Sequence, residues 1–139
     1  MKLVLDASVI LKLVLIQDEP HREKALEIIK NFQIDLVQII LPSFWKYEIG
    51  NILSTKEDNF ADFYKFILNI GFSNHEFSND ELIEIGEFAK KYNVSFYDAS
   101  YHILAKLTNS VFVTADEAYF DKAKKAGSIV LLRNLNLVA

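Results

Sequence analysis

The sequence predicts a layered α/β domain built on a parallel β-sheet. Short apolar runs alternate along the chain with longer segments in which apolar residues recur at helical spacing. The short runs lack a regular alternation of polar and apolar residues, which is typical of parallel strands that are buried on both faces. The chain has 139 residues, 51% of them hydrophobic, which is enough for one such domain with one core.

The expected elements follow from these patterns. We expect strands at Lys2–Leu5, Leu36–Leu41, Val111–Thr114 and Ser128–Leu132. Apolar residues three or four positions apart predict helices at His21–Phe32, Ser43–Leu53, Phe60–Ile70, Asp80–Tyr92, Ser95–Leu107 and Glu117–Ala126. The polar segments Thr55–Asn59 and Gly71–Asn79 are interpreted as linkers. We therefore expect a single domain over residues 1–139, in which the central helices of about residues 55–93 form an arm or clip.

Composition and charge narrow the class of protein. No apolar run approaches the ~20 residues that a membrane-spanning helix needs. The N-terminal segment MKLVLDAS lacks the long apolar stretch and cleavage site of a signal peptide, so we expect a soluble, cytoplasmic protein. A net charge of −4 argues against a broadly basic nucleic-acid-binding surface, but leaves room for a local RNA site. Because the chain has no cysteine, only oxygen and imidazole ligands remain for a metal.

Four acidic residues occupy positions that favour a ligand site. Asp6 ends the first expected strand, and Asp116 directly follows the strand VFVT. In open parallel sheets the crevice beyond the carboxyl ends of the strands binds ligands, particularly where the strand order reverses. Asp98 opens the helix of VSFYDASYHILAK with no cation beside it, and Glu48 lies within PSFWKYEIGNIL.

Glu48 is expected on the core side of its helix. Trp45 and Ile52 lie close to it by the three-or-four-residue rule, and Ile49 follows it directly. A glutamate in such a place needs a partner, and the sequence offers no obvious lysine or arginine at the right spacing.

The three aspartates also have a purely structural interpretation. The segments Ser95–Asp98 and Thr114–Glu117 both fit a capping box, and Asp6 can cap a helix that follows it. Caps are common at such positions, so each aspartate taken singly is explained as well by capping as by chemistry.

Taken together, four carboxylates at one site require a cation. Each pair would repel by roughly 3 kcal/mol at ~5 Å with an effective dielectric constant near 20. Oxygen ligands without cysteine point to Mg²⁺ or Mn²⁺, which keep several waters and accept one or two carboxylates together with a phosphate oxygen. Ions of this kind serve the hydrolysis of phosphodiester bonds.

The motifs DASVILKL, LPSFWKYEIGNIL, VSFYDASYHILA and VFVTAD, in this order, resemble the PIN domain over nearly the whole chain. In particular they are similar to the PIN-domain toxins of VapBC toxin–antitoxin pairs. The resemblance implies a three-layer α/β/α fold in which the first strand lies beside the strand ending at Thr114. It also implies Mg²⁺- or Mn²⁺-dependent cleavage of RNA, a homodimer, and a cognate antitoxin that lies across the acidic groove.

By this resemblance the metal-binding and catalytic acids are Asp6, Glu48, Asp98 and Asp116. Ser8 and Thr114 are the hydroxyl residues beside the first and last acids, and Asp121 is a possible additional acid. Glu48 is either a ligand or the group that orients the attacking water. Lys12, Lys46 and Lys106 are candidates for contacts to RNA phosphates, with surface solubility as the alternative. Gly50, within the Glu48 helix, is the chief departure from the family pattern, and it either weakens that helix slightly or allows close packing.

Other interpretations remain open. His102 stands four residues after Asp98, so a helical Asp–His metal pair is geometrically allowed. A receiver-like phosphoacceptor domain is a second alternative, although the strand Leu36–Leu41 ends in Pro42–Ser43 without an acceptor aspartate. A third is a catalytically idle PIN-fold module that only binds a protein partner. No glycine-rich loop indicates a nucleotide cofactor.

Overall fold

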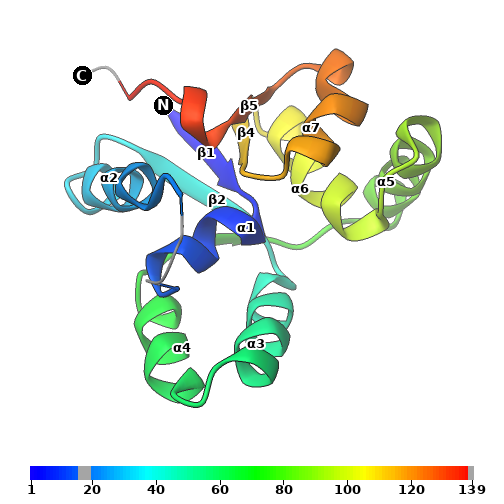
Figure 1. The fold of residues 1–139 in the computed structure, drawn as a ribbon. Helices are drawn as coiled ribbons and strands as arrows, with labels where there is room; N and C mark the ends of the chain where they lie inside the picture. Colours follow the sequence, from blue (N-terminus) through cyan, green and yellow to red (C-terminus); the bar gives the residue numbers. More distant parts are fainter. Residues whose placement is uncertain (16–19, 138–139) are drawn as a thin grey trace.

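The computed structural model describes residues 1–15 and 20–137 and centres on a five-stranded, all-parallel sheet (Figure 1). The strands in spatial order are β3 (Ser73–His75), β2 (Gln38–Pro42), β1 (Lys2–Leu5), β4 (Val111–Thr114) and β5 (Ile129–Leu131). The α-helices are α1 (Ala7–Ile10), α2 (Arg22–Gln33), α3 (Trp45–Lys56), α4 (Phe60–Leu68), α5 (Asn79–Tyr92), α6 (Phe96–Leu107) and α7 (Glu117–Ala123). Three short 3₁₀ turns lie at Leu11–Leu13, Lys124–Ala126 and Leu132–Asn134.

Helices cover both faces of the sheet. Helices α1 and α2 lie on one side, whereas α6 and α7 lie on the other (Figure 1). This arrangement follows from the chain path, because right-handed crossovers place connections on opposite faces when the direction of strand addition reverses. The predicted α/β/α architecture is thus confirmed. No helix among the described residues is long and apolar enough to cross a membrane.

The two central strands form the most buried part of the core. Leu3, Val4 and Leu5 of β1 and Phe112 and Val113 of β4 are all at most 1% exposed. Burial on both faces explains why these strands show no alternation in sequence, and both have the predicted bounds. The predicted strands at 36–41 and 128–132 are also present, with ends shifted by one to two residues.

Several short elements were not predicted. The segment Gly71–Asn79, interpreted as a linker, contains β3, whose residues Ser73–His75 pair with Ile40–Pro42. That prediction was wrong because the Ser-Asn-His sequence of an edge strand carries no apolar signal. The short helix α1 and the following 3₁₀ turn were likewise hidden within the apolar run after Asp6.

The central segment 55–93 divides among three places. Helix α4 pairs with α3 in a hairpin that projects from the body of the molecule, β3 joins the sheet, and α5 packs against α6 (Figure 1). The projecting hairpin is close-packed at Gly50, because a Cβ atom built there would lie 2.8 Å from the Tyr64 hydroxyl oxygen. That hydroxyl donates a hydrogen bond to the Lys46 carbonyl. Gly50 therefore permits close packing, the second of its two expected roles.

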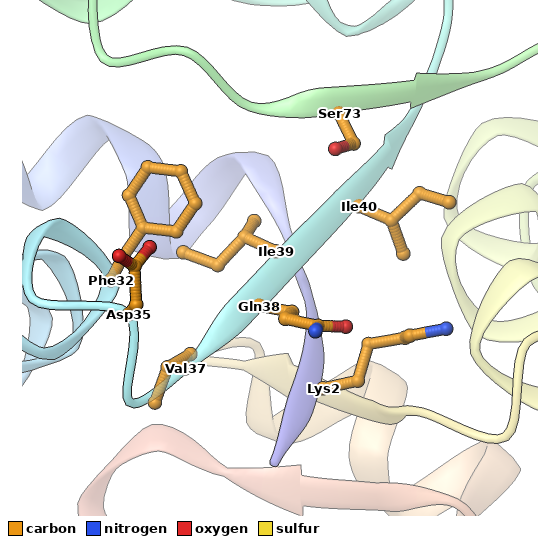
Figure 2. Close-up of a pocket in the computed structure, with 8 residues that line it drawn as sticks. All are labelled: Lys2, Phe32, Asp35, Val37, Gln38, Ile39, Ile40 and Ser73. Carbon is orange, nitrogen blue, oxygen red and sulfur yellow. The ribbon is translucent and has the colours of Figure 1, made fainter.

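The strand order reverses between β1 and β4. From β1 the chain adds β2 and β3 on one side, and then returns to add β4 and β5 on the other. The carboxyl ends of β1 and β4 consequently flank the point at which parallel sheets bind ligands. A hollow open to solvent lies at the opposite end, where Lys2 begins β1 and Gln38 begins β2 (Figure 2). Its lining extends along β2 to Ile40 and reaches Ser73 of β3, and it includes none of the four predicted acids.

Gly50→Ala is expected to lower the free energy of unfolding, because the new methyl group would meet the Tyr64 hydroxyl at 2.8 Å. Gly86→Ala in α5 is the matched control, since among the described residues no atom outside its own helix backbone lies within 4 Å of the added Cβ. The control should gain up to about 1 kcal/mol from helix propensity. Urea unfolding of both variants measures the difference, and an equal gain in both would contradict close packing at Gly50.

Candidate active site

The carboxylate of Asp6 is buried between the ends of β1 and β4. Its side chain is 7% exposed, and its Oδ2 atom accepts hydrogen bonds from the Ser8 hydroxyl at 2.7 Å and the Thr114 hydroxyl at 2.8 Å. Neither bond uses Oδ1. The backbone N–H of Asp6 donates to the Val113 carbonyl, which continues the β1–β4 pairing past the strand end. Asp6 is thereby fixed by groups from both central strands.

The two hydroxyls connect Asp6 to the loop that carries Asp116. The Ser8 Oγ atom accepts from the Ala115 backbone N–H at 3.2 Å, and the Thr114 Oγ1 atom accepts from the Asp116 backbone N–H at 3.0 Å. Each hydroxyl therefore donates to a carboxylate and accepts from a backbone amide. This arrangement holds the beginning of the β4–α7 connection against the end of β1.

The capping interpretation fails for Asp6 and for Thr114. Asp6 stands at the N-cap position of α1, but its side chain forms no capping hydrogen bond there. Thr114 is the last residue of β4, so the N-cap of α7 falls on Asp116 instead. The hydroxyl of Thr114 is thus free to serve Asp6, and the predicted Thr114–Glu117 capping box was wrong by two residues.

Burial, helped by the negative charges of Asp98 and Glu48, raises the pKa of Asp6 to about 7 against the lowering effect of the two hydroxyls. A carboxylate buried in this way carries a large desolvation cost unless a positive charge accompanies it. The contributions of Asp98 and Glu48 indicate that both lie close enough for their charges to act on Asp6.

Glu48 lies on α3 and faces Tyr101 of α6. The Tyr101 hydroxyl donates a hydrogen bond of 2.8 Å to the Glu48 Oε1 atom. Partial burial raises the pKa of Glu48, and the charge of Asp98 raises it further. Glu48 is partly buried at the edge of the core face of α3, which consists of Trp45, Ile49 and Leu53. Its partner is a tyrosine hydroxyl on another helix.

Asp98 lies in the first turn of α6 and is half-buried. Its backbone N–H donates to the Ser95 hydroxyl at 3.0 Å, so Ser95 caps the helix. The reciprocal bond of a capping box, from the Asp98 carboxylate to the Ser95 backbone, is not among the hydrogen bonds of the described residues. The Ser95 hydroxyl and the positive end of the helix dipole both favour the charged form of the Asp98 carboxylate. Burial and the nearby charge of Asp116 nevertheless raise the pKa of Asp98.

Asp116 completes the group of four. It is the exposed N-cap of α7, and its Oδ1 atom accepts from the Tyr119 backbone N–H at 3.0 Å. The charge of Asp116 acts on Asp98, while the charge of Asp98 acts on Asp6 and Glu48. The four predicted acids are thus electrostatically coupled through Asp98.

His102 is excluded as a metal ligand. It is fully buried, and both ring nitrogens are used within the protein. The Nε2 atom lies 2.7 Å from the Gly127 carbonyl oxygen and can only donate to it, so the Nδ1 atom accepts from the Tyr119 hydroxyl at 2.8 Å. Burial lowers the pKa of His102, which keeps the ring neutral. The proposed Asp98–His102 pair is therefore not formed.

The other candidate residues from the sequence are Asp121 and three lysines, and none of them belongs to the group of four acids. Asp121 is exposed on α7 and forms an ion pair with Lys124 at 3.8 Å, so the structure does not bring it to the four acids. Lys46 is exposed, and Lys106 donates to the Ala126 carbonyl. Lys12 is only 6% exposed, which excludes the surface-solubility interpretation for that residue.

The donor set fits a hydrated divalent cation. Among residues 1–15 and 20–137, no three acidic or histidine side chains converge closely enough to hold an ion directly. Mg²⁺ does not need such a cage, because it commonly binds through one or two carboxylates and keeps the rest of its shell as water. The side chains at the site offer only oxygen donors, which suit such an ion. Its positive charge would also offset the repulsion among the carboxylates and lower the pKa of Asp6, which is about 7 without it.

Sequence reasoning missed two tyrosines that lie beside the acids. Tyr101 lies three residues after Asp98 on α6, so helical spacing could have placed both on one face. Tyr119 donates its backbone N–H to Asp116 and its hydroxyl to His102, and burial together with the charges of Asp98 and Asp6 raises the pKa of that hydroxyl. The pKa of Tyr101 is raised by burial and by the charge of Glu48. Both hydroxyls therefore stay protonated and can act as hydrogen-bond donors.

These features define a parallel-sheet α/β protein with an acidic centre at the point where its strand order reverses. A model of the PIN domain matches residues 3–126 of the chain. The protein therefore belongs to the PIN-domain family, as the sequence motifs predicted. The comparison with curated proteins found no match.

Several solved structures share the fold, among them the three that follow. PAE2754 from Pyrobaculum aerophilum has a TM-score of 0.69 and 21% identity, with 96% of this chain and 90% of that chain covered. VapBC2 from Rickettsia felis, bound to a DNA fragment from its promoter, has a TM-score of 0.65 and 16% identity, with 94% of this chain and 97% of that chain covered. FitAcB from Neisseria gonorrhoeae has a TM-score of 0.63 and 16% identity, with 96% of this chain and 99% of that chain covered. At these identities the likeness establishes the fold.

Without divalent metal, the protein is expected to lose stability as the pH rises from about 4 to about 7. The folded protein keeps the Asp6 proton up to a pKa of about 7, whereas the unfolded chain releases it near 3.8, so unfolding releases a proton in this window. The full shift corresponds to about 4 kcal/mol. Asp6→Asn should remove most of this pH dependence, which urea unfolding in chelator at several pH values measures.

Asp121→Asn is the control for this experiment, because its carboxylate is exposed and should leave the pH dependence unchanged. If Asp6→Asn were less stable than the parent at pH 8 and kept the same slope, Asp6 would be a stabilising structural group rather than a member of a repelling cluster.

Proposed function

We propose that this protein is a metal-dependent endoribonuclease, the toxin of a type II toxin–antitoxin pair. The observation that carries the proposal is the coupling of four carboxylates at the β1–β4 switch point, with the buried Asp6 held at a pKa of about 7. Membership of the PIN family and the resemblance of the motifs to VapBC toxins support it. The fold shared with VapBC2 and FitAcB is consistent with an antitoxin partner.

Asp6, Asp98 and Asp116 would hold Mg²⁺ or Mn²⁺, directly or through water. Such an ion, when bound, would activate a water for attack on phosphorus and stabilise the charge on the leaving oxygen. The Ser8 and Thr114 hydroxyls fix the orientation of the Asp6 carboxylate by donating to its Oδ2 atom. They would thereby keep its other oxygen directed to the ion.

Glu48 is placed to act as a ligand or to orient the attacking water. The Tyr101 hydroxyl occupies its Oε1 atom, which fixes the rotamer and leaves Oε2 for a second contact. Because the pKa of Glu48 is raised, its carboxylate accepts a proton more readily than an ordinary glutamate does. This property suits a group that takes a proton from water during hydrolysis.

We further propose that the protein acts as a homodimer in the cytoplasm and that its antitoxin covers the acidic groove. A catalytically idle PIN-fold module is the second candidate, and it would keep the fold and the partner without cleaving RNA. The presence of all four acids favours the active protein.

Cleavage of a panel of fluorescent single-stranded RNAs by the parent is expected in Mn²⁺ or Mg²⁺ and not in chelator. Asp98→Asn should lower the rate at least about 100-fold, because removing one member of such a catalytic group typically costs this much or more. Asp121→Asn should cleave like the parent, since its carboxylate lies outside the group.

The comparison of these variants distinguishes the two candidates. Equal cleavage by the parent and Asp98→Asn would indicate a contaminating nuclease. A parent that binds Mn²⁺ but cleaves no RNA of the panel would favour the idle module.

A further inference from the structure

A pocket beside Glu48 is lined by aromatic residues that the proposed chemistry does not use. It is formed by Phe44, Tyr47, Glu48, Asn51, Ile52 and Tyr97. Five of these residues lie on one stripe of α3 and its N-terminal end, because they are spaced by three or four positions. Tyr97 closes the pocket from α6. Its volume of about 630 Å³ falls within the range of ligand-binding pockets.

Two exposed tyrosines border the pocket at its junction with the acids. Tyr47 is 82% exposed and immediately precedes Glu48, while Tyr97 is 58% exposed and immediately precedes Asp98. A phosphodiester bond held at Glu48 and Asp98 would therefore have, on each of the two helices, an aromatic side chain on the residue next to the acid. Large aromatic side chains this open to water commonly mark a binding surface.

The floor of the pocket is fixed. The Phe44 ring packs edge-on against Tyr97, with centroids 5.2 Å apart, and against Tyr101, with centroids 5.7 Å apart. Tyr101 in turn donates to Glu48. The aromatic floor and the acidic centre are thus parts of one packed assembly, so a ligand seated on the floor would be positioned relative to the acids.

The chemistry of the lining favours a neutral, flat occupant. Glu48 is the one charged residue among the six lining side chains, and its negative charge would repel a phosphate placed inside the pocket. A nucleobase is uncharged, presents a face that stacks on tyrosine or phenylalanine, and has polar edges that the Asn51 amide can bind. The base can reach the pocket only when it is unpaired.

We infer that this pocket binds an unpaired base of the RNA substrate, next to the bond that is cut. The inference rests on the proposed nuclease function and adds to it a base-stacking subsite centred on Tyr47. The subsite selects single-stranded RNA, because a base within a duplex cannot stack on the ring. Because every base can stack on an aromatic ring, the subsite would distinguish single-stranded from double-stranded RNA more than it would distinguish one base from another.

The test compares Tyr47→Ala, Tyr47→Phe and the control Phe66→Ala in Mn²⁺ on a single-stranded RNA that the parent cleaves. Phe66 is 50% exposed on α4 and is absent from the lining of this pocket. Tyr47→Ala should raise KM about ten-fold with little change in kcat, as expected for the loss of one base–aromatic stack. Tyr47→Phe should restore the parent KM, and Phe66→Ala should leave it unchanged.

A second arm uses RNAs in which one base at a time is removed near the cleaved bond. The parent should cleave one of these abasic substrates with a KM raised about ten-fold, and Tyr47→Ala should no longer distinguish it from the intact RNA. Circular dichroism confirms that the variants are folded, which is expected because the Tyr47 side chain is exposed.

The outcomes separate this inference from the proposed function. A parent that cleaves RNA with no sensitivity to Tyr47 or to any abasic position contradicts the subsite alone. A parent that cleaves no RNA overturns the proposed function and the subsite with it. Unchanged cleavage by Tyr47→Ala combined with a lost dimer in ultracentrifugation would assign the pocket to contact between two copies of the chain.

Discussion

The site depends on the burial of one carboxylate at the seam between two parallel strands. Asp6 follows β1 at the position where β4 ends beside it, and the backbone pairing of Asp6 with Val113 leaves its side chain little solvent. Two hydroxyls stabilise the carboxylate without neutralising its charge. The remaining desolvation cost appears as a pKa of about 7. A site of this kind is poised to gain free energy when it binds a cation.

The other acids are positioned by ordinary elements of local structure. The N-terminal turn of α6, capped by Ser95, carries Asp98, and the N-cap of α7 is Asp116 itself. Asp116 therefore stabilises its helix and contributes charge to the site with the same carboxylate. Glu48 comes from the projecting α3–α4 hairpin, and its bond to Tyr101 ties that hairpin to the body of the molecule. Structural and chemical roles are thus combined in the same residues rather than being alternatives.

The sequence predicted those parts of the fold that have a strong periodic signal. Buried strands and amphipathic helices were found with small errors at their ends, and the adjacency of β1 and β4 followed from the family resemblance. The polar edge strand Ser73–His75 was missed because its backbone pairing, and not its side chains, makes it a strand. Thr114 was misread as a cap because only the register of β4 decides which residue begins α7. Partners brought together by tertiary packing, such as Tyr101 and Glu48, leave no local pattern in the chain except their helical spacing to other site residues.

The central claim is that the buried Asp6 carboxylate holds a proton until a cation binds to the acids. The number of protons released when Mn²⁺ binds tests this claim most directly. Titration calorimetry near pH 6, in two buffers of different ionisation enthalpy, counts the protons released per ion bound. The account predicts release approaching one proton near pH 6, none near pH 9, and a loss of this release in Asp6→Asn. Binding of Mn²⁺ without proton release at either pH, or equally tight binding with the same proton count in Asp6→Asn, would contradict it.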